Sequence, residues 1–268
     1  MTNALESPSL AIRLDYGAGV AGEPRAAREI AEILMRPCFA ALSRLSARRK
    51  DRWSKHAKPS VESIATYLAD ATNDAISMDT KRGQDLVASA EVENGVGRDA
   101  APIVATRLQA YAAIPYVAES LEAVVTGVRD LASALGAAAG FISLEPSYGL
   151  AHRAAVAASR PKERTGIGEQ RFRERRARLR YSDRIGTELA GVDWGTFLGP
   201  GHLERVDLGE LRRSGAFARV VEVSPKLGYL QISNDPLDDL TDGFEARLAL
   251  ARRALAPLLM DVSSISME

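Results

Sequence analysis

The stretch that most constrains the fold runs from residue 192 to residue 206 and reads VDWGTFLGPGHLERV. It contains Trp194, one of only two tryptophans in the chain, and three glycines and Pro200 follow within seven positions. Glycine permits backbone angles that are closed to other residues, and proline fixes one angle. Trp194 and Phe197 can each bury a large apolar area. We therefore expect a shaped connector with a structural motif of Trp194, Gly195, Gly199, Pro200, Gly201 and His202.

Composition places the chain among ordinary globular proteins. With 268 residues it is long enough for one large or two small domains. Lys+Arg and Asp+Glu number 35 each, and this zero net charge argues against a dedicated nucleic-acid binder. Cys38 is the single cysteine, so an intrachain disulfide and a thiolate metal cluster are excluded. No apolar run is long enough for a membrane span and no targeting segment is visible, so we expect a cytoplasmic protein.

The first half of the chain predicts an α+β fold. Residues 10–16 alternate apolar and polar side chains, which is typical of a half-buried strand. A helix is expected from Pro24 to Leu45, with a break at Pro37. The same signals predict further strands and helices at residues 61–71, 86–92, 103–111, 117–135 and 141–144. This order predicts a mainly antiparallel sheet with helices packed on one face, and two ferredoxin-like halves are one arrangement that fits.

A change in composition near residue 160 divides the chain. Residues 160–184 carry ten Lys or Arg against four Asp or Glu. We interpret this run as an exposed helix that joins two halves, with a nucleic-acid contact as the alternative. The prediction is an N-terminal α+β half, 1–160, and a C-terminal α+β half, 161–268, packed as one unit. In the second half we expect a short strand at 189–192, a helix at 203–211, a hairpin from strands 217–223 and 227–233, and a last helix at 244–259.

The sequence contains none of the common catalytic or metal-binding motifs. The three histidines, His56, His152 and His202, lie on different predicted elements, so we expect no metal site. His202 is the candidate general base of an enzyme alternative, a hydrolase or transferase, but no partner acid or nucleophile can be named. We therefore expect no enzyme and no cofactor. Residues 44–58 are strongly basic, and we favour a solvated helix end there over a phosphate-binding patch.

Acidic residues gather near the end of the chain. No Lys or Arg interrupts them before Arg247. The five acids, which fall within eleven positions, are Asp235, Asp238, Asp239, Asp242 and Glu245. The glycine and glutamate that an EF-hand calcium loop requires are not at the right positions. Two interpretations stay open: a solvated loop that caps the last helix, and a surface that contacts a partner protein.

Three stretches carry a family resemblance: FISLEPSY at 141–148, WGTFLGPGHL at 194–203 and GYLQISNDP at 228–236. In order and texture they resemble the type VI secretion immunity family of bacterial polymorphic-toxin systems. The resemblance extends over residues 85 to 262, and WGTFLGPGHL is its most specific part. It implies no catalytic residues and a protein that binds and neutralises a co-encoded toxin, a nuclease effector being one example. A nuclease has a basic substrate cleft, so we expect the acidic stretch to face the toxin. A structural or adaptor protein of a secretion or phage-like assembly is a further alternative.

Overall fold

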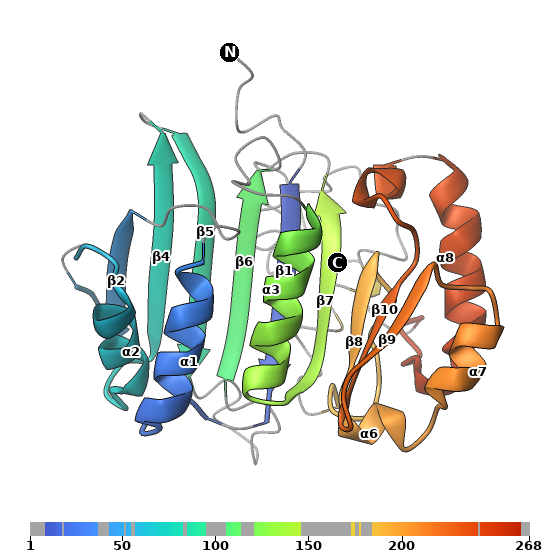
Figure 1. Ribbon diagram of the computed structural model, residues 1–268, viewed down its shortest axis with the longest axis horizontal. Helices are drawn as coiled ribbons and strands as arrows, with labels where there is room; N and C mark the ends of the chain where they lie inside the picture. Colours follow the sequence, from blue (N-terminus) through green and yellow to red (C-terminus); the bar gives the residue numbers. More distant parts are fainter. Residues whose placement is uncertain are drawn as a thin grey trace.

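The computed structural model describes residues 9–17, 19–36, 43–50, 52–54, 57–82, 85–94, 106–113, 121–145, 173–174, 177, 184–240 and 242–263. Its strands form one ten-stranded sheet in the order β3-β2-β4-β5-β6-β1-β7-β8-β10-β9, with antiparallel neighbours throughout (Figure 1). The predicted α+β class with a mainly antiparallel sheet is confirmed. The strands of the two predicted halves are parts of a single sheet.

The strands are β1 (Ser9–Tyr16), β2 (Arg44–Arg49), β3 (Arg52–Trp53), β4 (Ala75–Arg82), β5 (Asp85–Asn94), β6 (Thr106–Ala113), β7 (Ala137–Glu145), β8 (Gly195–Leu198), β9 (Arg219–Ser224) and β10 (Leu227–Gln231). The helices are α1 (Pro24–Leu34), α2 (Val61–Ala69), α3 (Leu121–Ala134), α6 (Pro200–Leu203), α7 (Leu208–Arg213) and α8 (Asp242–Ala254). Two short 3₁₀ helices flank α8: η4 (Pro236–Leu240) and η5 (Ala256–Leu258).

The main core lies between the sheet and the helices α1, α2 and α3, which cover one of its faces (Figure 1). Successive side chains of a strand point to opposite faces. In β1 the apolar set Leu10, Ile12, Leu14 and Tyr16 is buried. The Tyr16 hydroxyl donates to the carbonyl oxygen of Leu131 in α3 at 3.0 Å, so this set faces the helices. Removing these side chains from water is the main driving force for closing the layer.

Local signals explain several elements that occur where the sequence predicts them. Pro24 stands in the first turn of α1, where its missing N–H costs nothing. Ser60 caps α2: its hydroxyl accepts the Ser63 N–H at 3.1 Å, and the Ser63 hydroxyl accepts the Ser60 N–H at 2.8 Å. Strands β1, β5, β6 and β7, helix α3 and the β9–β10 hairpin also lie at their predicted places.

The region from residue 44 to residue 58 differs from its prediction. Residues 44–49 form strand β2, not the end of a helix, and Leu45 pairs with Met78 of β4. The guanidinium of Arg48 contacts the Glu93 carboxylate at 3.5 Å, so a neighbouring strand supplies the opposite charge. Strand β4 was not predicted at all. It pairs with β2 on one side and β5 on the other, and local spacing does not reveal these partners. Pro37 and Leu42 lie outside the described residues.

In the C-terminal part, several elements differ in detail from those predicted. Two short helices, α6 and α7, replace the single helix expected at 203–211, because the Asp207 carboxylate accepts the Glu210 N–H at 2.7 Å and starts α7. At 189–192 there is only an isolated bridge, which joins Leu189 to Leu259. The acidic stretch contains the 3₁₀ helix η4 and is not an open loop. Strand β8 pairs with β7, so the sheet continues from the first half into the second. Whether the halves act as one unit stays a prediction.

Candidate functional site

Trp194 lies in the core and shows 2% of its surface to solvent. Its indole Nε1–H donates to the Ser233 hydroxyl at 3.0 Å, and its carbonyl oxygen accepts the N–H of Ile232 at 2.9 Å. The side chain therefore joins the start of β8 to the residues that follow β10. Phe197, three residues further along the chain, packs its ring against Tyr229 with the ring centroids 4.8 Å apart. Both predicted apolar anchors, Trp194 and Phe197, are buried.

The glycines of the motif provide space, and not the unusual backbone angles that the sequence suggests. Gly199 has φ −79°, an ordinary value, but a Cβ there would lie 2.2 Å from the carbonyl oxygen of Ala138. A Cβ on Gly201 would lie 2.4 Å from the carbonyl oxygen of Gly186. One on Gly195 would lie 2.9 Å from the Tyr229 hydroxyl. Thus the stretch consists of strand β8 and helix α6 pressed against β7 and its neighbours, with Pro200 opening the helix.

His202 is fully buried, and its partners are backbone groups. Its Nδ1 accepts the N–H of Gly199 at 3.2 Å and closes the first turn of α6. Burial lowers the pKa of His202 to about 4, and the nearby charge of Arg205 adds to this, against the opposing influence of the Glu188 and Ala138 backbone. Within the described part of the chain, no hydrogen bond joins the His202 ring to a carboxylate that would orient a general base or to a nucleophile. The imidazole is neutral at pH 7 and serves as a helix cap.

The predicted acidic stretch is held on the surface by its own hydrogen bonds. The Asp235 carboxylate is exposed and accepts the N–H of Leu237 at 2.8 Å. The Asp238 carboxylate lies 3.6 Å from the guanidinium of Arg247 in α8. Glu245 is exposed on α8, and the side chains of Asp239 and Asp242 lie outside the described residues. Segment η4 contacts β7, which places this surface beside the middle of the sheet.

A buried group of charges that the sequence does not reveal crosses β1 and β6. The Asp15 carboxylate accepts from Arg13 Nε at 2.8 Å and from Arg107 Nε at 2.7 Å. All three side chains are at most 6% exposed, on the sheet face opposite α1 and α3. Burial alone would raise the pKa of Asp15, but the two guanidinium groups hold it below its usual range. The alternating pattern predicted a solvated polar face for β1, whereas all eight of its residues are buried.

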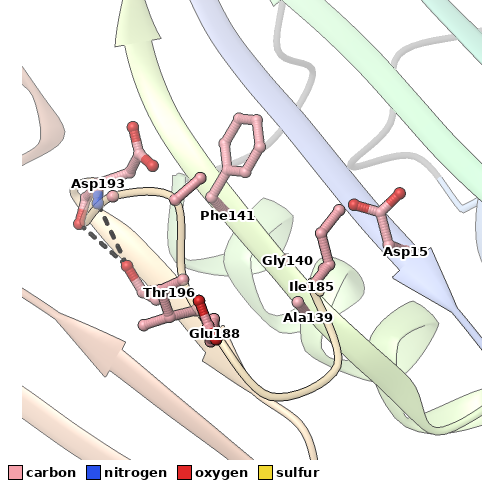
Figure 2. Close-up of a pocket in the computed structure, with 11 residues that line it drawn as sticks. Asp15, Ala139, Gly140, Phe141, Ile185, Glu188, Asp193 and Thr196 are labelled. Carbon is pink, nitrogen blue, oxygen red and sulfur yellow. Dashed lines mark hydrogen bonds between the residues drawn. The ribbon is translucent and has the colours of Figure 1, made fainter. Parts of the chain in front are cut away.

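A small pocket adjoins this charge group (Figure 2). It lies between the sheet and the segment from Ile185 to Thr196, with Asp15 and Phe141 among its walls. Figure 2 shows the carboxylates of Asp15, Glu188 and Asp193 on different sides of the space. Its water-accessible volume is about 30 Å³, which suits a few water molecules and is far below the size of a ligand site. The pocket therefore supplies no substrate cavity.

A wider groove opens between the α6–α7 turn and the end of α8. Its volume is about 590 Å³, within the range of binding sites. The apolar residues that line it are Leu203, Val206, Leu211, Ala254 and Pro257. The acids that line it are Glu204, Asp207 and Glu210, all exposed. We call this surface the α6–α8 groove.

The described residues contain neither a candidate metal group nor a helix that could span a membrane. No group of three or more His, Cys, Asp or Glu side chains among them is placed to hold a metal ion. None of the helices found there has the length and apolar character needed to cross a bilayer.

Comparison with known proteins gives a structural likeness. No family model matches the sequence, and no curated protein matches it. Among solved structures, the chain is similar to the one titled "Pseudomonas aeruginosa T6SS protein PA0821". The TM-score is 0.61 and the identity 14%, and the likeness covers 94% of this chain and 73% of that one. It shows that the two proteins share a fold.

Proposed function

We propose that this chain is an immunity protein that binds and neutralises a co-encoded toxin of a type VI secretion system. The observation that carries the proposal is the shared fold with a protein titled as part of that system, over 94% of this chain. The resemblance of the segments at 141–148, 194–203 and 228–236 to the immunity family points the same way. In the fold two of these segments, β7 and β8, are neighbours, and β8 also pairs with β10 of the third.

We further propose that the protein acts by binding and not by catalysis. An immunity protein needs a rigid, complementary surface and no reactive side chain. The features of His202 fit this role, because the ring is buried and its hydrogen bond goes to the backbone of Gly199. The exposed acids of the C-terminal part supply charge for recognition, since complementary charge speeds association and rejects wrong partners.

Co-expression with the candidate toxin, encoded beside this gene, tests the proposal. Cells that make both proteins should survive, and the purified pair should elute as one complex from a sizing column. His202→Gln is the informative variant, because glutamine can still cap α6. We expect H202Q to protect fully. Survival lost with the complex still formed would favour an enzyme that uses His202, and absence of both protection and complex from the wild-type chain would overturn the immunity proposal.

A further inference from the structure

The α6–α8 groove combines an apolar floor with three carboxylates against a single lining cation, Arg205. Leu211 in its floor is 5% exposed, so this part of the groove is anchored in the core. Among the described residues, none of the three carboxylates at Glu204, Asp207 and Glu210 forms an ion pair. Elsewhere on the surface, acids such as Glu122 and Asp238 have an arginine partner.

Two arginines at or near the groove donate their hydrogen bonds to backbone carbonyl oxygens and not to the groove carboxylates. The Arg205 guanidinium donates to the carbonyl oxygens of Thr187, at 2.8 Å, and of Pro257. It thereby fastens the α6–α7 turn to the segments on either side. Arg212 donates to the carbonyl oxygen of Val220 in β9 at 3.1 Å and does not line the groove. The lining therefore presents a surplus of negative charge.

The groove is also preformed. The Asp207 cap fixes the start of α7, and the Ser214 hydroxyl donates to the Leu211 carbonyl oxygen at 2.6 Å, which fixes its end. On the opposite side of the groove, the two hydrogen bonds of Arg205, to Thr187 and Pro257, fix the position of the α6–α7 turn. A surface that is already ordered loses little conformational entropy on binding, so more of the contact energy appears as affinity.

We propose that the α6–α8 groove is the surface that holds the toxin, and that it accepts a segment carrying lysine or arginine beside apolar side chains. This inference rests on the proposed immunity function. Apolar side chains of the segment would cover the floor at Leu203 and Val206, and its cations would meet the carboxylates on the rim. A nucleic acid is disfavoured because its phosphates would meet like charge. The sequence-predicted stretch at Asp235 and Asp238 is the competing surface, but there Asp238 already faces Arg247.

The experiment compares two matched charge-removal variants. The groove variant carries Glu204→Gln, Asp207→Asn and Glu210→Gln, and asparagine keeps the helix cap at position 207. The control carries Asp235→Asn and Asp238→Asn. Association with the purified product of the neighbouring toxin gene is measured by biolayer interferometry at two salt concentrations, and melting curves verify folding. A second probe, a ten-residue synthetic peptide of lysine and leucine, is titrated by fluorescence anisotropy to test the groove without the toxin.

We expect the groove variant to associate with the toxin about tenfold more slowly at low salt, with a weaker salt dependence, while the control keeps the wild-type rate. The peptide should bind the wild-type chain and the control but not the groove variant. Unchanged toxin association in the groove variant would overturn the groove proposal and leave the immunity function standing. A third outcome is that the wild-type chain does not bind the toxin but binds the peptide, and the groove variant binds neither. That outcome would overturn the immunity function and the toxin as the occupant of the groove. The groove would then remain a site for basic segments. Loss in the control alone would assign the toxin to η4.

Discussion

At the residue scale, Asp15 balances two buried positive charges. Arg13 and Arg107 converge on its carboxylate, and Arg107 Nη2 has no hydrogen-bond partner in the described part of the chain. Transferring charges from water into the interior costs several kcal/mol per ion, and only their mutual attraction and hydrogen bonds offset that cost. The three charges therefore stabilise one another only together, and both arginines depend on the Asp15 carboxylate.

Asp15→Asn should therefore destabilise the fold by about 3–5 kcal/mol, because it removes the carboxylate that both buried guanidinium groups contact. The matched control is Asp130→Asn, which breaks the ion pair with Arg36 on the surface, where both side chains are more than 40% exposed. We expect that control to change stability by less than about 1 kcal/mol. Urea unfolding at pH 7 measures both variants. Equal losses would mean that the buried group contributes no more than a surface pair.

His202 should make stability depend on pH in a defined window. Its folded pKa of about 4 lies below the ordinary value of 6.5, so below pH 6.5 the unfolded chain binds a proton that the folded chain refuses. Stability from this residue is complete above pH 6.5 and falls by roughly 3 kcal/mol as the pH drops to about 4. His202→Gln should flatten the unfolding free energy over that range. The lowered pKa of Asp15 acts at lower pH, and an unchanged slope in H202Q would disprove the assignment.

At the element scale, the β8–α6 junction depends on close approach to β7. The sequence marks this segment as constrained, because it combines tryptophan, glycine and proline. It could not show the reason, since the obstacle to a side chain at Gly199 is a carbonyl oxygen about 60 residues earlier in the chain. The same limit explains why β4 and the burial of Arg13 were not predicted. Strand spacing reports alternation, whereas burial depends on what covers each face.

Gly199→Ala should cost about 1–3 kcal/mol or more, because the new methyl group would meet the Ala138 carbonyl oxygen and sheet pairing keeps that atom in place. Gly243→Ala is the control: a Cβ there has nothing within 4 Å, and the residue belongs to α8. Alanine is the better helix former, so we expect G243A to be neutral or to gain up to about 1 kcal/mol. The melting temperature should fall in G199A and stay the same or rise in G243A. An unchanged melting temperature in G199A would show that β7 can shift to accommodate the methyl group.

At the scale of the whole molecule, the ten strands of one sheet span both predicted halves. The two tryptophans fall one in each half: Trp53 at the β3 edge, 47% exposed beside Arg48, and Trp194 in the core. The order of strands could not be predicted from the sequence, because neighbours such as β1 and β7 are far apart in the chain. Which strands become neighbours depends on how all the strands and helices pack together.

Cooperative unfolding is the corresponding prediction. Trp53→Phe leaves fluorescence from Trp194 alone, and Trp194→Phe leaves it from Trp53 alone. In each variant the fluorescence transition in urea should coincide with the far-ultraviolet circular dichroism transition, as a two-state protein requires. Two separate midpoints, with one tryptophan reporting earlier than the backbone signal, would show that the halves unfold independently. Fragments 1–160 and 161–268 expressed alone should then fold, whereas we expect neither to do so.

The central place of β1 has a consequence for synthesis on the ribosome. This strand is translated before both of its neighbours, since Ser9 pairs with Ala113 in β6 and with Glu145 in β7. Its pairing with β7 can be complete only when Glu145 has emerged, more than 100 residues after β1 ends at Tyr16. Pairings so distant in sequence slow folding and lengthen the period of exposure to aggregation. Under the proposed immunity function, a cell would therefore have to begin making the protein well before it meets the toxin.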